Sequence, residues 1–388
     1  MVLLAILGLS VVIFFHELGH FLAAKAFRVR VEEFGFGYPP RLGGFIFYKS
    51  GFLGLWKKNK IKFFLGKNVP SEAKKNTIYS INWIPFGGFN KLKGEMGEKD
   101  NEPDSFFAQA WWKKAITSLG GAGMNILLAI FIFIVCYFIG IPQDLNQSEE
   151  GKIIRSVGIQ INSVIPDSPA EKGGLKVGDV IEEIDNQKLI KIDELQTYIK
   201  TRVNNNLEIK INRRGDLIKT NVAVIPIQDI VSGTEGGNYG AIGISLSQTA
   251  IVSYPFFRSV VLGVKTTFSL AWRMLDGLWL ILKNLVVEHK MIGEVSGPVG
   301  LTVLATQVAR IGFIYFLQFM ALISVAIGVC QIIPFPALDG SRFVFSLIEG
   351  IRRKPFNRQV ENIIISIGFY ILVTVLIFIT FKEIFKLF

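Results

Sequence analysis

Four long apolar runs set the pattern of the chain. They cover, in chain order, residues 1–26, 112–141, 311–340 and 360–382. Each run holds about the 20 apolar residues that a helix needs to cross a bilayer. Pro142 follows the second run and Pro334 interrupts the third, and prolines of this kind are typical of helix ends. The pattern predicts a polytopic α-helical membrane protein with four transmembrane helices.

Residues 27–111, between the first two runs, have a β pattern. Aromatic and branched residues favour strands there, and glycines and prolines divide the stretch into short pieces. We expect short strands around Gly35–Gly37 and a β-hairpin within residues 77–92. The lysine-rich stretch at 49–75 is typical of a solvated or lipid-facing insert.

Two further segments separate the second and third runs. Residues 158–226 combine alternating strands with a helical stretch at 192–202, which predicts a soluble α/β module. Residues 227–309 begin as a linker with a short strand and continue into a helix over 254–287. The charged residues of that helix follow one stripe, which predicts an amphipathic helix on the membrane surface.

Composition indicates a membrane protein, and the distribution of charge predicts its orientation in the membrane. Half of the residues are hydrophobic and 19% are charged, whereas soluble chains carry about 25% charge. The net charge is +11, with 17 basic against 8 acidic residues in 25–114 and 17 against 18 in 141–309. The positive-inside rule places 25–114 and the basic loop 341–359 in the cytoplasm and both termini outside. Topology and anionic lipid explain the basic excess, so we expect no nucleic-acid partner.

The candidate chemistry lies in the first apolar run, which contains His16-Glu17-Leu18-Gly19-His20. Residues four apart share one helix face, so the two histidines can hold one metal ion while Glu17 activates a water. Ionisable groups in hydrocarbon each cost about 2.5–3.5 kcal/mol on insertion scales. They therefore need a partner or a purpose, although a chance match to the pattern is the alternative.

A hydrolytic zinc site needs a third protein ligand beside an open water position. Glu32 or Glu33 could reach the histidines only through a tight turn. Asp339 is the better candidate, because it follows a helix break in an apolar setting at the predicted depth of His20. Its alternative role is to cap a helix.

These groups predict metal-assisted peptide hydrolysis, in which Glu17 takes a proton from water and passes it to the leaving amine. A helical substrate must first unwind, and an exposed strand edge at Gly35–Gly37 or within 77–92 can pair with its extended backbone. Asn125 and Gln331 are candidate hydrogen-bond donors to the substrate backbone or oxyanion.

With H-E-L-G-H in the first run and P-F-P-A-L-D-G in the third, the chain resembles the site-2 protease family of intramembrane zinc metalloproteases. The likeness is to the bacterial branch that cleaves anti-sigma factors and signal-peptide remnants. Five further motifs carry it, namely G-F-G at Gly35, Phe36 and Gly37, P-x-G-G with Gly87 and Gly88, a small-residue segment ending at Asn125, S-P-A…G-L-x-x-G-D at Ser168–Asp179, and G-P-V-G at Gly297–Gly300.

The resemblance implies the zinc ligands His16, His20 and Asp339, with Glu17 as general base. It implies that the hairpin re-enters the membrane, and that Gly35, Phe36, Gly37, Gly87 and Gly88 contact the substrate. Residues 158–226 would be an extracytoplasmic PDZ domain of unidentified peptide-binding residues, filtering single-span substrates already trimmed by an upstream site-1-type protease. The implied location is the bacterial plasma (inner) membrane.

The chain departs from the family pattern at three points. Gln331 and Ala326 stand where the family usually has asparagines, only one PDZ module is recognisable, and the insert at 49–75 is long. A second hypothesis is a non-catalytic membrane scaffold that binds peptides through its PDZ module and holds a structural metal. A transporter fits poorly, because the two halves of the chain do not repeat a broken helix.

Overall fold

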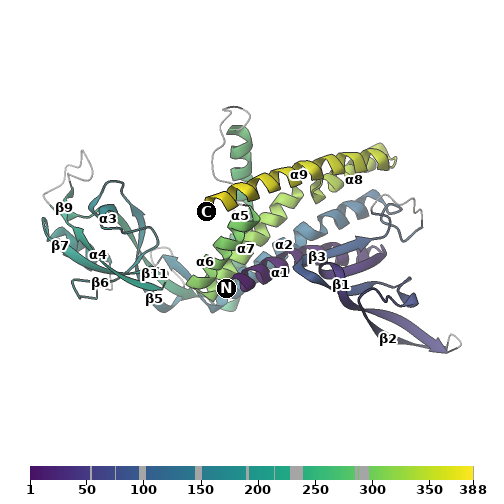
Figure 1. The fold of residues 1–388 in the computed structure, drawn as a ribbon, viewed down its shortest axis with the longest axis horizontal. Helices are drawn as coiled ribbons and strands as arrows, with labels where there is room; N and C mark the ends of the chain where they lie inside the picture. The colour runs from purple at the N-terminus through teal and green to yellow at the C-terminus, as the bar shows by residue number, and fades with distance from the viewer. Residues whose placement is uncertain are drawn as a thin grey trace. The chain divides into compact units, whose positions relative to one another are not determined.

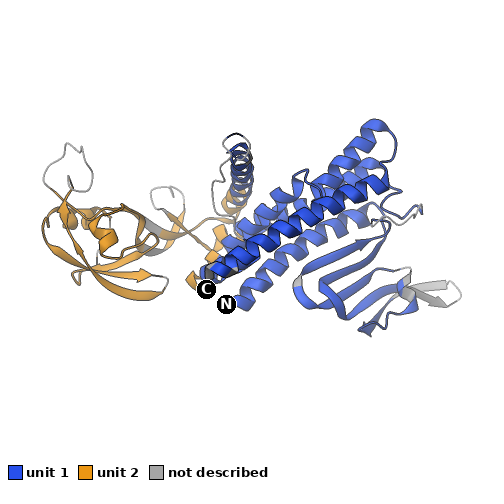
Figure 2. Ribbon diagram, turned by 45° about the horizontal axis from the view of Figure 1, so that its top comes forward, with its two compact units in different colours: residues 1–133, 263–309, 316–388 blue, residues 134–262, 310–315 orange. Residues whose placement is uncertain are grey.

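The structure of the chain is a computed structural model. It describes residues 1–52, 55–74, 76–95, 102–144, 151–188, 192–213, 215–227, 239–284, 287 and 297–387. The chain forms two compact units (Figure 2): the first contains residues 1–133, 263–309 and 316–388, and the second contains 134–262 and 310–315. The long helices α2 and α5 each pass from one unit into the other.

Four helices in the described part of the chain are long and apolar enough to cross a membrane. They are α1 (Val2–Ala26), α2 (Trp111–Ile139), α7 (Phe313–Ile332) and most of α9 (Arg358–Leu387). Helix α5 (Phe256–Lys283) occupies the predicted amphipathic segment, and α6 (Pro298–Ile311) is a shorter apolar helix that the pattern did not predict.

The third apolar run, assigned to 311–340 with a break at Pro334, divides at that break, but the prediction of a loop over 341–359 is wrong. Helix α7 ends at Ile332, and a separate helix, α8 (Asp339–Arg352), occupies most of the predicted loop. The prolines around Phe335 end α7. The basic residues of α8 concealed its amphipathic pattern, and its Glu349 forms a partly buried ion pair with the buried Lys114 of α2, with N–O distances of 2.6 and 2.7 Å.

Helices α1, α2 and α7 of the first unit lie side by side (Figure 1), and they pack closely where their residues are small. A Cβ on Gly19 of α1 would lie 2.1 Å from the Gly120 carbonyl oxygen of α2, so the two backbones touch. The apolar core beside this contact joins α1, α2, α6 and α7 through residues that include Ala5, Val12, Leu128, Ala305 and Met320. The glycines predicted from the sequence as packing residues therefore bring α1 and α2 together.

A three-stranded sheet in the order β2-β1-β3 lies against α1. Its strands are β1 (Val31–Phe52), β2 (Leu55–Leu65) and β3 (Ile78–Leu92), and the short helix η1 (Ser71–Lys74) precedes β3. Phe34 pairs with both Asn90 and Tyr79, so the two arms of β3 flank β1.

The predicted hairpin within 77–92 is thus a bent strand whose arms are separated by β1. The glycines of β1 explain the difference, because a Cβ on Gly37 would lie 2.5 Å from the Ile84 carbonyl oxygen. Backbone can approach that closely only where no side chain intervenes. The lysine-rich stretch 49–75 lies largely in the β1–β2 pair, and its residues 53, 54 and 75 fall outside the described residues.

The second unit contains a six-stranded sheet in the order β4-β11-β5-β6-β7-β8. Its strands are β4 (Ile141–Asp144), β5 (Lys152–Val164), β6 (Val180–Ile184), β7 (Asn206–Arg213), β8 (Asp216–Ala223) and β11 (Ile244–Ser253). The unit also contains helices α3 (Pro169–Lys172) and α4 (Ile192–Lys200) and the small strand pair β9 (Ile225–Pro226) and β10 (Gly240–Ala241).

The module predicted at 158–226 is therefore larger than expected, because β4 and β11 extend its sheet. Its core is aliphatic and includes Ile159, Leu195, Leu207 and Ile209. The carboxylate of Asp179, 1% exposed, accepts two 2.7 Å hydrogen bonds from Arg213, which satisfies a charge that would be costly to bury alone.

Candidate active site

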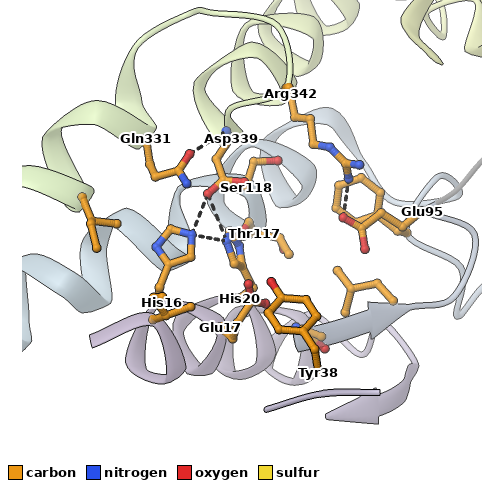
Figure 3. A pocket seen from close by; sticks show the side chains of 16 residues that line it. His16, Glu17, His20, Tyr38, Glu95, Thr117, Ser118, Gln331, Asp339 and Arg342 are labelled. Carbon is orange, nitrogen blue, oxygen red and sulfur yellow. Dashed lines mark hydrogen bonds and ion pairs between the residues drawn. The ribbon is translucent and has the colours of Figure 1, made fainter. Parts of the chain in front are cut away.

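Helix α1 directs two imidazoles to one point. His16 and His20 lie one turn apart on one face, and their Nε2 atoms are 3.2 Å from each other. Asp339, the first residue of α8, brings its Oδ2 atom to 3.0 Å from His16 Nε2 and 3.1 Å from His20 Nε2 (Figure 3). Residues more than 300 positions apart in the chain thus form one cluster, which we call the His–His–Asp triad.

The break between α7 and α8 places Asp339 in the triad. A Cβ on Gly340 would lie 2.3 Å from the carbonyl oxygens of both Ile332 and Ile333, so the start of α8 can approach the end of α7 only with glycine there. The backbone N–H of Asp339 donates to Gln331 Oε1 at 3.4 Å. These contacts explain why glycine follows the aspartate directly.

Helix α2 packs against the two imidazoles and accepts a hydrogen bond from one of them. A Cβ on Gly121 would lie 2.4 Å from His20 Nε2 and 2.5 Å from His16 Cε1, so glycine leaves the room that the rings occupy. The Thr117 carbonyl oxygen accepts a 2.8 Å hydrogen bond from His20 Nδ1. That bond places the ring proton on Nδ1 and leaves the Nε2 lone pair of His20 directed at the triad, as in metal-ligating histidines.

The triad fits a zinc ion. Each of its three residues offers one ligand atom, and these atoms lie within 4.8 Å of one another. Two imidazole nitrogens and one carboxylate oxygen match the ligands of catalytic zinc sites and leave a fourth position for water or substrate. The two alternative third ligands are engaged elsewhere, since Glu32 pairs with Lys91 and Glu33 pairs with Arg41.

The triad opens into a cavity of about 470 Å³ whose lining includes Glu17. Ile13, Leu92 and Phe106 contribute apolar walls. Arg342, one turn after Asp339 on α8, forms an ion pair with Glu95 across the lining (Figure 3). The cavity therefore combines candidate metal ligands, the Glu17 carboxylate, which pairs with no residue that the structure describes, and apolar surface.

The predicted substrate-binding residues fall in three places. Gln331 lines the cavity. Asn125 is fully buried, and its side-chain amide has no hydrogen-bond partner among the described residues, but it is not one of the cavity-lining residues. The glycines at 35, 37, 87 and 88 and Phe36 belong to the sheet and do not line the cavity. A Cβ on Gly87, for example, would lie 2.4 Å from Ile13 of α1.

Several lining residues were not predicted from the sequence. Tyr38 and Asn90 come from the sheet, and Thr117 and Ser118 from the start of α2. Thr117 and Ser118 precede Gly121 by four and three residues, about one helical turn, so they could have been found once that glycine was assigned to the site. No sequence signal distinguishes Tyr38 or Asn90 from other polar residues of the strands.

The fold and the site together define a membrane-embedded metalloprotease. The chain belongs to peptidase family M50, whose sequence profile matches residues 4–53 and 51–375. This finding confirms the resemblance to the site-2 proteases on which the sequence analysis relied.

Several bacterial proteins that carry the provisional name of zinc metalloprotease are similar to this chain over almost its whole length. A provisionally named zinc metalloprotease of Clostridium perfringens is 30% identical over 99% of this chain and 98% of its own length. One from Rhizobium meliloti is 27% identical, over 97% of this chain and 94% of its own length. A third, from Campylobacter jejuni, is 27% identical, over 98% and 92%.

Two solved structures are similar to part of the chain. The PDZ domain of an SdrC-like protein from Listeria monocytogenes is 27% identical, with a TM-score of 0.20, over 23% of this chain and 86% of the domain. Its counterpart from Listeria innocua is 28% identical, with a TM-score of 0.20, over 23% of this chain and 92% of the domain.

Proposed function

We propose that this metalloprotease hydrolyses peptide bonds within the transmembrane segments of single-span membrane proteins, with zinc held by His16, His20 and Asp339 and with Glu17 as general base. The observation that carries the proposal is the His–His–Asp triad, which shares its cavity with Glu17. The substrates are of the anti-sigma-factor or signal-peptide-remnant type, after trimming by an upstream site-1-type protease.

The chemistry follows from the groups in the cavity. Bound zinc supplies Lewis acidity, which lowers the pKa of water and polarises the scissile carbonyl. The Glu17 carboxylate takes the proton of the attacking water and delivers it to the leaving amine nitrogen, since it is the carboxylate of the cavity that is neither in the triad nor paired with Arg342. The Gln331 amide, beside Asp339, is placed to donate a hydrogen bond to the substrate backbone.

The depth of the site supports cleavage inside the bilayer. His16 and His20 lie ten and six residues before the end of α1 at Ala26, or about 15 and 9 Å along the helix axis. If α1 spans a hydrocarbon core of about 30 Å, the triad lies below the membrane surface. The triad would then act on the scissile peptide bond of a substrate within the membrane.

The bend of β3 supports the re-entrant position of the sheet. Ser10, in the middle of α1, donates a 2.6 Å hydrogen bond to the Pro85 carbonyl oxygen at that bend. Ser10 lies sixteen residues before Ala26, which is about 24 Å along the axis. The tip of β3 therefore reaches the depth of the bilayer core, where α1 satisfies one of its backbone groups, as irregular backbone at that depth requires.

An open strand edge supports the binding of an unwound substrate. The 88–92 arm of β3 pairs with β1 on one side and with no described strand on the other. Asn90 and Leu92 of that arm line the cavity. A substrate strand added to this edge would run beside the triad, with Gly87 and Gly88 at its deep end, and would exchange its helical hydrogen bonds for those of the sheet.

The proposed membrane topology rests on the distribution of basic residues along the chain. The basic segments around Lys25 and Arg352 lie in the cytoplasm, so both termini and the second unit lie outside, in a bacterial inner membrane. On that side the 158–226 module acts as a PDZ domain that admits trimmed substrates. Lipid and single-span proteins are the partners, and Asn125 and the Gly35–Gly37 segment contribute to substrate binding.

The test uses purified full-length protein in lipid vesicles, a single-span substrate and the matched variants Glu17→Gln and Glu32→Gln. We expect Glu17→Gln to retain zinc and lose cleavage, because the ligands survive while the base is gone. Glu32→Gln should retain both, and a zinc chelator should stop the parent enzyme reversibly. Cleavage that survives the chelator or Glu17→Gln would refute the proposal, and peptide binding by the 158–226 module without any cleavage would favour a scaffold.

A further inference from the structure

One aromatic residue enters the cavity from the sheet. Tyr38 follows Gly37, whose φ of +79° directs the chain into the bend of β1, and it pairs with Ile84 of β3. Its ring is half-exposed and lines the cavity, and its hydroxyl points towards Glu17 and His20 (Figure 3). The bent sheet thus places a phenol beside the general base of the proposed reaction.

The Tyr38 hydroxyl is available to a ligand. It makes no hydrogen bond with any residue that the structure describes. The guanidinium of Arg342, the cationic group of the same lining, is already held by Glu95. Tyr38 is therefore a donor near Glu17 that no described protein group occupies.

The phenol of Tyr38 is neutral near pH 7. Burial raises the pKa of Tyr38 above its ordinary value of 10, and the nearby Glu17 carboxylate raises this pKa further. A neutral phenol is a hydrogen-bond donor. The Tyr38 hydroxyl points towards Glu17 (Figure 3), so it faces the part of the cavity in which that base would act.

We propose that the Tyr38 hydroxyl donates a hydrogen bond to the oxyanion that develops on the scissile carbonyl when water attacks. The inference rests on the proposed peptide hydrolysis. The carbonyl oxygen gains negative charge as the new C–O bond forms, and a donor that the sheet holds in place stabilises that charge without reorganising. The hydroxyl keeps its proton throughout, and the hydrogen bond weakens when the carbonyl re-forms and the amine leaves.

The test compares Tyr38→Phe with Tyr79→Phe. Each variant removes one phenolic oxygen from the same sheet, but Tyr79 stacks on Phe45 with ring centroids 5.2 Å apart and does not line the cavity. We expect Tyr38→Phe to lower kcat by about 10²-fold and to leave KM and zinc content within a factor of about two, because the lost interaction exists only in the transition state. Tyr79→Phe should match the parent.

A second readout separates stabilisation of the oxyanion from a structural role. A phosphinic peptide, whose anionic oxygens mimic the tetrahedral state, should bind Tyr38→Phe about 10²-fold more weakly, whereas the acid limb of the pH–rate profile should not move. A shifted acid limb would show that Tyr38 acts through Glu17 and would overturn the inference. Equal kcat in parent and Tyr38→Phe would do so too. A parent enzyme that cleaves no substrate would instead refute the proposed function.

Discussion

Replacing Gly121 with alanine tests the geometry of the triad with a single methyl group. The added Cβ would lie 2.4 Å from His20 Nε2, and 2.5 and 2.6 Å from Cε1 and Nε2 of His16. All three distances are below the roughly 3.4 Å of ordinary contact, so both imidazoles must move by up to about 1 Å or the helices must separate. Such overpacking costs about 1–3 kcal/mol.

Displaced imidazoles should weaken metal binding more than they weaken the fold. A change in residues that hold the metal ligands in place lowers metal affinity about 10–100-fold. We therefore expect Gly121→Ala to lose zinc at a chelator concentration that leaves the parent loaded, and to lose peptidase activity in step. Zinc is measured in the purified protein by mass spectrometry after dialysis against graded chelator, and the fold is followed by circular dichroism.

Gly123 provides the matched control in the same helix. A Cβ there would have no neighbour within 4 Å, so Gly123→Ala should leave zinc affinity unchanged. It should also raise stability slightly, since alanine favours a helix interior by about 0.5–1 kcal/mol over glycine. If Gly121→Ala binds zinc as tightly as Gly123→Ala does, the described arrangement of α1 and α2 at the triad is wrong.

Two further predictions concern buried polar contacts. Glu349→Gln should destabilise the protein by about 3–5 kcal/mol, because it leaves the buried Lys114 ammonium without its charge partner. Thermal unfolding in detergent should show this, and a Lys114→Met/Glu349→Met double variant should recover most of the loss; an unchanged melting temperature in Glu349→Gln contradicts the pairing. Ser10→Ala leaves the Pro85 carbonyl without its donor, at a cost of about 1–3 kcal/mol. Amide hydrogen exchange at the β3 bend should then accelerate about tenfold or more, whereas unchanged exchange would show that the bend is held by other contacts.

The sequence by itself determined the elements that depend on local chemistry. The apolar runs predict the long helices, because burial of backbone and side chains in lipid requires long uninterrupted apolar segments. The H-E-x-x-H spacing predicts that His16 and His20 share a face, because the helical period is local. Asp339 could be proposed as their partner from its helix break and its predicted depth, although nothing in the local pattern requires the contact.

Prediction failed where one element's conformation depends on another. The basic loop proved to be α8, whose partly buried Glu349 is neutralised by Lys114 of α2. The hairpin proved to be a bent strand, because β1 inserts between the arms of β3. Lys114 and strand β1 lie outside the two segments concerned. The hydrophobic periodicity within each segment was therefore not sufficient to predict its conformation.

Tertiary structure alone decided which groups meet around the triad. Gly121 appears in the sequence as a packing residue, but only the approach of α2 to α1 shows that its missing side chain makes room for two imidazoles. Tyr38 is an ordinary strand residue until the bend of β1 directs it towards Glu17. Helical and strand periods are properties of a few neighbouring residues, whereas this cavity arises from close packing between segments far apart in the chain, and that packing decides which side chains line it.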